Sequence, residues 1–212
     1  MKRNFWLITG ALIILLAALC ILRVSPFKLY EQDIIASLQS QQSPTSITFF
    51  QIISDYGKYI NIGIPAIFLI IGLWLKKKNY TRNALIVLLA MAFSGIIAQS
   101  IKRTVKEPRP YEVDSRITQY SVGGSNSFPS GHTAETSVAA LGFMILLFGT
   151  PRSRAASIPW MIIMMMSRIV LGVHNFTDII GGFVTACLGL YVVYNLFEKY
   201  APGYKDPVSL KI

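Results

Sequence analysis

The chain has 212 residues, of which 53% are hydrophobic and 14% are charged, and its formal net charge is +10. A soluble domain carries about 25% charged residues, and long apolar runs are typical of transmembrane helices, so a soluble globular domain is excluded. The basic residues flank the apolar runs and form no single stripe, which argues against nucleic-acid binding. Because there is no internal repeat and no interdomain linker, we expect residues 1–212 to form one integral-membrane domain.

Six apolar runs are candidates for membrane-spanning helices, since a bilayer core of about 30 Å needs roughly 20 residues of helix. They cover approximately residues 5–22, 59–75, 84–101, 134–149, 156–173 and 177–196. The sequence therefore predicts an all-α bundle of six transmembrane helices. The first run follows MKR, as the apolar part of a signal peptide would, but LLAALCILRVS lacks a small-x-small cleavage site. We interpret this run as a retained span.

The first outer connection, residues 23–58, contains YEQDIIASLQ and SITFFQIISDYGKYI. Both segments are amphipathic and predict short helices that lie at the membrane interface on the outer side. The two cysteines, Cys20 and Cys187, stand inside apolar runs without the spacing of metal ligands or of a disulfide framework. We expect them to be small buried hydrophobic residues.

Orientation follows from the basic residues of the short loops. Six spans place both termini on one side, together with Lys2, Arg3, Lys76, Lys77, Lys78, Arg82, Arg152, Arg154, Lys199, Lys205 and Lys211. The opposite side holds Arg23, Lys28, Lys58, Lys102, Arg103, Lys106, Arg109, Arg116 and Arg168. The positive-inside rule makes the first side cytoplasmic. The excess of basic residues on the cytoplasmic side is small, because the outer connection from Lys102 to Arg116 is itself strongly basic. Basic residues on the outer side require a separate explanation.

That second outer connection, from about residue 102 to 131, is long enough to predict a functional role. It opens with KRTVKEPRPY, in which Lys102 and Arg109 flank a basic turn, and it closes with SFPSGHT. Ser130 is placed to cap the fourth span, whose first N–H groups, including that of Gly131, favour an anion. Taken alone, the first segment is better explained as a solvated charge run and the second as an ordinary capped helix.

The segment SRIVLGVHNFTD places ionisable groups between two very apolar stretches, where they are costly and typical of function. We expect Ser167 and Arg168 near the outer end of the fifth span, His174 in the outer turn and Asp178 at the start of the sixth. A spacing of four brings His174 and Asp178 to one face of a helical turn. The carboxylate can then accept one ring N–H and leave the other ring nitrogen free. The alternative is a helix-capping aspartate beside an interfacial histidine.

The predicted spans bring these three segments to the same outer face. The two histidines of the chain, His132 and His174, both lie in them. The segments together supply two imidazoles, a helix N-terminus, an orienting carboxylate and three cations, Lys102, Arg109 and Arg168. This set predicts a site at which a phosphate is attacked and transferred. The sequence has no Asp/Glu/His cluster suited to a metal, and three cations can neutralise a phosphate without one.

With these residues the chain resembles the type 2 phosphatidic acid phosphatase family. The signature of that family is Lys-x6-Arg-Pro, then Pro-Ser-Gly-His, then Ser-Arg-x5-His-x3-Asp. The chain matches every element, with Lys102 to Arg109-Pro110, Pro129 to His132, and Ser167-Arg168 through His174 to Asp178. The six-span layout extends the resemblance over most of the chain, and the family implies that neither a metal nor a cofactor takes part.

The resemblance also implies a role for each residue. His174 would be the nucleophile that forms a phosphohistidine, and Asp178 would orient it. His132 would protonate the leaving group and then activate water. The phosphate-binding residues would be Lys102, Arg109, Ser130, Gly131 and Arg168.

The expected protein is a metal-independent lipid phosphate or diphosphate phosphatase of a bacterial plasma (inner) membrane, with cytoplasmic termini and a site facing the periplasm or exterior. Undecaprenyl diphosphate, phosphatidylglycerol phosphate, phosphatidic acid and a lipid A phosphate all fit as substrates, and the oligomeric state is open. A lipid phosphotransferase with the same site is the alternative. Vanadate-dependent haloperoxidases share the signature but are soluble. A transporter would need charges in the middle of the spans, whereas Glu135, the one ionisable residue clearly inside a span, is near the outer end of the fourth.

Overall fold

The computed structural model describes residues 4–22, 27–124, 126–148 and 150–201. These residues contain helices and no strand, which confirms the predicted all-α class. The helices are α1 Phe5–Leu22, α2 Phe27–Ser40, α3 Pro44–Trp74, α4 Lys78–Val105, α5 Pro110–Val113, α6 Gly131–Gly142, α7 Pro151–Val170 and α8 Phe176–Tyr200, and a π-helical turn, Phe143–Phe148, continues α6.

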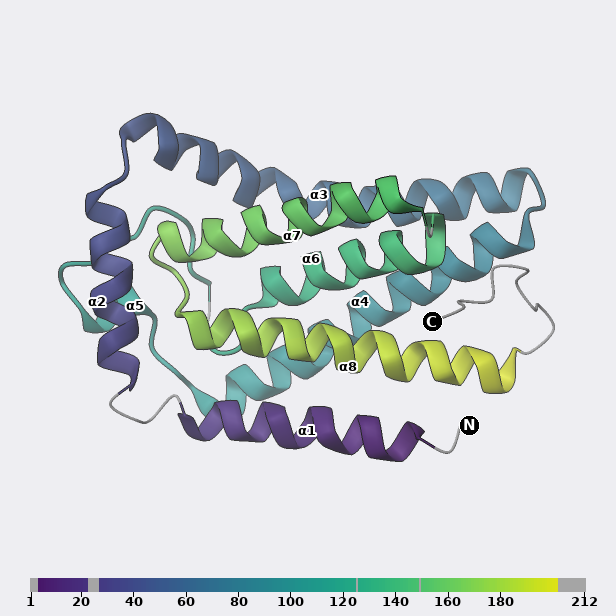
Figure 1. Ribbon diagram of the computed structural model, residues 1–212, viewed down its shortest axis with the longest axis horizontal. Coiled ribbons are helices and arrows are strands. Elements are labelled where there is room, and N and C mark those ends of the chain that lie inside the picture. Colours follow the sequence, from purple (N-terminus) through teal and green to yellow (C-terminus); the bar gives the residue numbers. More distant parts are fainter. Residues whose placement is uncertain (1–3, 23–26, 125, 149, 202–212) are drawn as a thin grey trace.

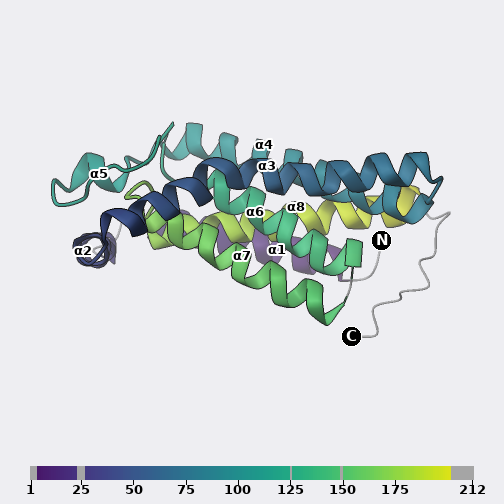
Figure 2. The same cartoon turned by 90° about the horizontal axis from the view of Figure 1, so that it is seen from above.

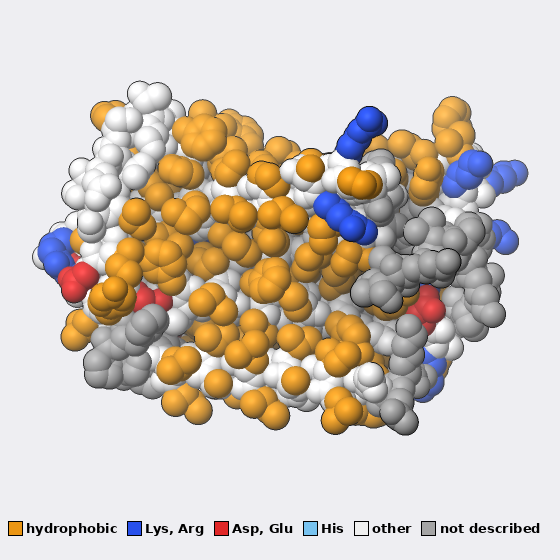
Figure 3. Space-filling view, in the orientation of Figure 1, with side chains coloured by type: hydrophobic (Ala, Val, Ile, Leu, Met, Phe, Trp, Pro, Cys, Tyr) orange, Lys and Arg blue, Asp and Glu red, His pale blue; other side chains and the backbone are white. Residues whose placement is uncertain are grey.

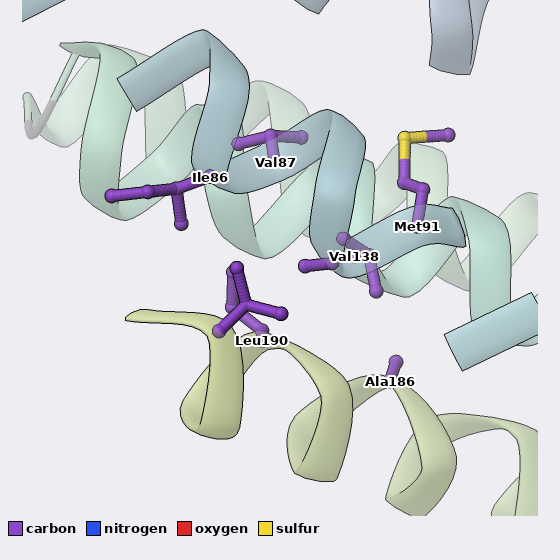
Figure 4. Packing of buried hydrophobic residues seen from close by; sticks show 8 residues of the cluster. Ile86, Val87, Met91, Val138, Ala186 and Leu190 are labelled. Atoms are coloured by element: carbon purple, nitrogen blue, oxygen red, sulfur yellow. The ribbon is translucent and has the colours of Figure 1, made fainter. Parts of the chain in front are cut away.

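Helices α1, α3, α4, α6, α7 and α8 run side by side along the long axis of the molecule (Figures 1 and 2). The largest buried cluster joins α4, α6 and α8, and Figure 4 shows its side chains between these helices. Ile86 and Val87 of α4 meet Val138 of α6 and Leu190 of α8 there. Gly189 lets α8 approach α4 closely, because a Cβ at this position would collide with Ser94.

Four helical segments are long and apolar enough to cross a membrane, namely α1, α3, the segment Lys78–Val113 that includes α4, and α8. The other two predicted spans correspond to α6 with its π-helical turn and to α7, which lie in the same bundle. Hydrophobic side chains cover the middle of the face in Figure 3, as expected for a surface in contact with lipid. That all six helices cross the membrane stays a prediction.

The segment 46–60 differs from its prediction as an interfacial helix, because it forms the first half of the 31-residue helix α3. The side chain of Ser43 caps this helix and Pro44 takes its first position, which suits proline because the missing N–H has no partner there. A Cβ at Gly57 would collide with Met164 of α7. This part of α3 therefore belongs to a long helix of the bundle and packs against α7.

The predicted short helix in residues 23–58 is present as α2, which lies across one end of the bundle (Figures 1 and 2). Its place at the membrane interface stays a prediction. The turn between α7 and α8 and the start of α6 lie at this same end. The α3–α4 turn, the start of α7 and the end of α8 lie at the opposite end, as the sequence predicts. Five of the basic residues used to orient the chain lie outside the described residues, namely Lys2, Arg3, Arg23, Lys205 and Lys211.

Candidate active site

The three sequence motifs meet at the end of the bundle that α2 crosses. A cavity of about 840 Å³ opens between them. Six of the eight predicted site residues line it, namely Lys102, Arg109, Gly131, His132, Arg168 and His174. The other two, Ser130 and Asp178, are buried behind this lining.

His174 and Asp178 form a buried pair at the turn between α7 and α8. Gly172 makes this turn with a φ of 73°, and a side chain at this position would collide with Thr118. Asn175 caps α8, and its backbone N–H donates to Asp178 Oδ2 over 2.8 Å. Asp178 Oδ2 lies 3.2 Å from His174 Nδ1, so the carboxylate holds this side of the ring.

The contact with Asp178 determines which ring nitrogen of His174 is free. A neutral imidazole facing a carboxylate through Nδ1 carries its proton there, so the lone pair resides on Nε2. Nε2 lies 3.5 Å from Arg109 Nη1, on the side of the cations. Burial, and then the positive charges of Arg168, Arg109 and Lys102, lower the pKa of His174 well below its ordinary value. The ring is therefore neutral, and available as a nucleophile, near pH 7.

The three predicted cations are all at most 5% exposed. Each donates hydrogen bonds to backbone carbonyl or hydroxyl oxygens. Lys102 Nζ donates to the carbonyl oxygens of Asn126 over 2.5 Å and of Ser127 over 2.8 Å. Arg109 Nη1 donates to the carbonyl oxygen of Val173 over 2.6 Å. A buried charge is costly unless it meets a partner, so three cations around one cavity favour an anion of high charge density such as phosphate.

Arg168 approaches the cavity from the end of α7 and is held by hydroxyl groups. Its Nη1 donates to Ser54 Oγ of α3, and it lies 3.4 Å from Ser121 Oγ in the loop before α6. The guanidinium is thus hydrogen-bonded to α3, which lies outside the three motifs. A planar guanidinium held in this way is suited to two-point recognition of phosphate oxygens.

The second motif starts α6. Ser130 is the N-cap, as predicted, and its Oγ accepts from Thr133 N over 3.3 Å and from Thr133 Oγ1 over 2.9 Å. Gly131 and His132 are the first two residues of the helix and line the cavity. The N–H groups of a first helical turn have no partner within the helix and attract anions.

Ser127 is a site residue that the sequence did not reveal. It is buried, its Oγ donates to Asp178 Oδ2 over 2.5 Å, and it lies 3.4 Å from His174 Nδ1. It therefore supports the histidine–aspartate pair from the second motif. Nothing distinguishes it in the sequence from the other serines of SVGGSNS, because its role depends on the packing of that loop against α8.

The sequence model of the PAP2 superfamily matches residues 83–201, which is more than half of the 212 residues. The chain belongs to the PAP2 superfamily. The matched part of this PAP2 protein contains all three motifs, so the resemblance seen in the sequence is confirmed.

Curated relatives of this PAP2 protein include two kinds of lipid A phosphatase. The lipid A 1-phosphatase of Rhizobium etli is 32% identical over 97 residues, which are 43% of this chain and 40% of that protein. The chain thus matches well under half the length of this relative. The lipid A 4'-phosphatase of Porphyromonas gingivalis is 28% identical over 182 residues, which are 79% of this chain and 72% of that protein.

Two solved PAP2-like structures share the fold. The transmembrane PAP2 type phosphatidylglycerolphosphate phosphatase of Bacillus subtilis has a TM-score of 0.72 at 20% identity, over 91% of this chain and 96% of that one. Aquifex aeolicus LpxE has a TM-score of 0.60 at 19% identity, over 77% and 93% of the two chains. Among the described residues of this PAP2 protein, no three His, Cys, Asp or Glu side chains are grouped as metal ligands.

Proposed function

We propose that this protein is an integral-membrane lipid phosphatase that works through a phosphohistidine on His174. The observation that carries the proposal is the buried His174–Asp178 pair, whose Nε2 faces the cavity that three buried cations line. Membership of the PAP2 superfamily and the names of the relatives agree with a phosphatase.

In the first step, Nε2 of His174 attacks the phosphorus atom while Asp178 holds the proton on Nδ1. An N–P bond forms, and the P–O bond to the lipid breaks. His132, which takes up a proton when the anionic phosphate binds beside it, donates this proton to the departing oxygen, which avoids a lipid alkoxide. Lys102, Arg109 and Arg168 bind the non-bridging oxygens as charge develops on them.

In the second step, water attacks the phosphohistidine. His132, now neutral, accepts a proton from this water, which raises its nucleophilicity. The new O–P bond replaces the N–P bond, inorganic phosphate leaves, and His174 returns to its neutral form. The step needs no acceptor other than water.

The shape of the cavity supports a lipid as the substrate. Beyond the cations it is lined by apolar residues of α3, α4 and α6, among them Ile62, Met91 and Ile96. Ile62 is 49% exposed and Ile96 is 65% exposed, so the cavity reaches the surface of the bundle that faces lipid. An acyl or prenyl chain can therefore stay in the membrane while its phosphate meets His174.

Phosphate release from purified protein in detergent tests the function. We expect release from at least one of undecaprenyl diphosphate, phosphatidylglycerol phosphate, phosphatidic acid and lipid A, without a second lipid as acceptor. Because the cations of the chain suffice for the phosphate, EDTA should leave the rate unchanged, and vanadate should inhibit as a mimic of the five-coordinate transition state. No release from any of the four lipids, or loss in EDTA with recovery in Mg²⁺, contradicts the proposal.

Labelling of single cysteines tests the predicted orientation, in which the site faces outward and the termini lie in the cytoplasm. Val122, 85% exposed in the loop before α6, and Lys77, exposed in the α3–α4 turn, lie at opposite ends of the bundle. In a variant without Cys20 and Cys187, Val122→Cys should react with an impermeant maleimide on intact cells, and Lys77→Cys only after lysis. The cysteine-free parent is the control, and the reverse pattern would invert the orientation.

A further inference from the structure

Helix α2 carries a buried carboxylate toward the catalytic turn. Glu31 is 1% exposed, although α2 lies across the end of the bundle and outside the part of the chain matched by the PAP2 superfamily. A carboxylate is almost never fully buried unless it is paired or hydrogen-bonded. Its position therefore requires a specific set of partners.

The partners of Glu31 are both on one residue of α8. Its Oε1 accepts from the backbone N–H of Thr177 over 2.7 Å, and its Oε2 accepts from Thr177 Oγ1 over 3.0 Å. Thr177 is the second residue of α8, where a backbone N–H has no partner within the helix. A negative group at a helix N-terminus is also favoured by the helix dipole. Burial raises the pKa of Glu31, and the two bonds from Thr177 oppose this shift.

Thr177 lies between His174 and Asp178 in the chain, so it is part of the turn that aligns the catalytic pair. Asp178 Oδ2 meets Ser127 Oγ, Asn175 N and His174 Nδ1 within 3.2 Å. A rotation of the first turn of α8 would change all three contacts together. Glu31 restrains this turn from an element 146 positions away in the chain.

We propose that Glu31 is a positioning residue for the nucleophile, which fixes the first turn of α8 and thereby aims Nε2 of His174 at the phosphate. The inference rests on the proposed phosphatase function. Glu31 lies outside the lining of the cavity, and the phosphate-binding cations belong to other elements. Its loss should therefore slow the attack on phosphorus with little change in substrate binding.

Three variants in α2 distinguish a role in positioning His174 from a general contribution of α2 to the stability of the fold. Glu31→Ala removes both bonds to Thr177. Glu31→Gln keeps them, because its amide oxygen can accept from the N–H and its amide nitrogen can donate to the hydroxyl. Gln39→Ala is the matched control, since Gln39 also fastens α2, through bonds to the carbonyl oxygens of Thr118 over 2.8 Å and of Val170 over 2.9 Å.

The kinetic readouts are kcat and KM on the lipid substrate and the pre-steady-state burst with 4-nitrophenyl phosphate. Misplacement of a reacting group by about 1 Å can cost roughly 100-fold, so Glu31→Ala should lower kcat and the burst rate about 10- to 100-fold. KM should stay within about 3-fold, and Glu31→Gln should recover most of the rate. Gln39→Ala should lower the melting temperature and keep kcat.

Hydrogen exchange gives a readout that does not depend on activity. Amide exchange across residues 175–180 should be faster in Glu31→Ala than in the wild type, Glu31→Gln or Gln39→Ala. Unchanged exchange or kcat in Glu31→Ala, or an equal loss of kcat in Glu31→Gln or Gln39→Ala, overturns the inference. A wild-type protein that releases no phosphate from any lipid contradicts the proposed function itself, so the two failures are distinguishable.

Discussion

His174→Ala and His132→Ala are each expected to abolish turnover of a lipid phosphate, but only His132→Ala should retain a burst of product from a substrate with an acidic leaving group. Without His174 there is no nucleophile, so no phosphoenzyme can form from any substrate. Without His132 the nucleophile remains, but a lipid alkoxide must leave unprotonated. General acid help is worth typically 10²–10⁴-fold.

The substrate 4-nitrophenyl phosphate separates the two histidines, because nitrophenolate is a good leaving group that needs little protonation. His132→Ala should give a rapid burst of nitrophenol and then slow turnover, since the water that attacks the phosphohistidine still lacks its base. His174→Ala should give no burst. The wild-type enzyme in detergent must first accept this substrate, and equal melting temperatures exclude misfolding. If His174→Ala gave the burst and His132→Ala did not, the two roles would be exchanged.

Asp178→Asn should lower the rate of phosphoenzyme formation by about 10³–10⁴-fold, comparable to the corresponding change in a serine-protease triad. The ring of His174 gains positive charge as its Nε2 bonds to phosphorus, and the carboxylate at 3.2 Å from Nδ1 stabilises that charge. An amide has the same shape without the charge. Burst kinetics with 4-nitrophenyl phosphate measure this rate directly.

Ser127→Ala perturbs the same carboxylate more mildly than Asp178→Asn does. It removes one hydrogen bond to Asp178 Oδ2 and leaves the carboxylate in place. A hydrogen bond to a charged group contributes about 1.5–3 kcal/mol, so we expect a loss of at least about 10-fold. If Asp178→Asn cost no more than Ser127→Ala, the charge of Asp178 would not be what assists His174.

The sequence by itself determined the helical class and the family, and it predicted eight residues of the candidate site. The apolar runs are local features of the chain, and they mark most of the bundle helices to within a few residues. The motifs are also local, because each holds its residues at a fixed spacing within twelve residues of the chain. Ser130 caps α6 as its place before the helix predicts, and six of the eight predicted residues line one cavity because the packing of the bundle brings the three motifs together.

Only the tertiary structure decided the features that join distant parts of the chain. The segment 46–60 is amphipathic enough for an interfacial helix, but in the folded chain it is continuous with the rest of α3 and packs against α7 at Gly57. Ser127 and Glu31 have ordinary surroundings in the sequence, and their partners, Asp178 and Thr177, lie 51 and 146 positions away. A hydrogen bond over such separations depends on how the helices pack. The periodicity and spacing of residues in the sequence do not predict that packing.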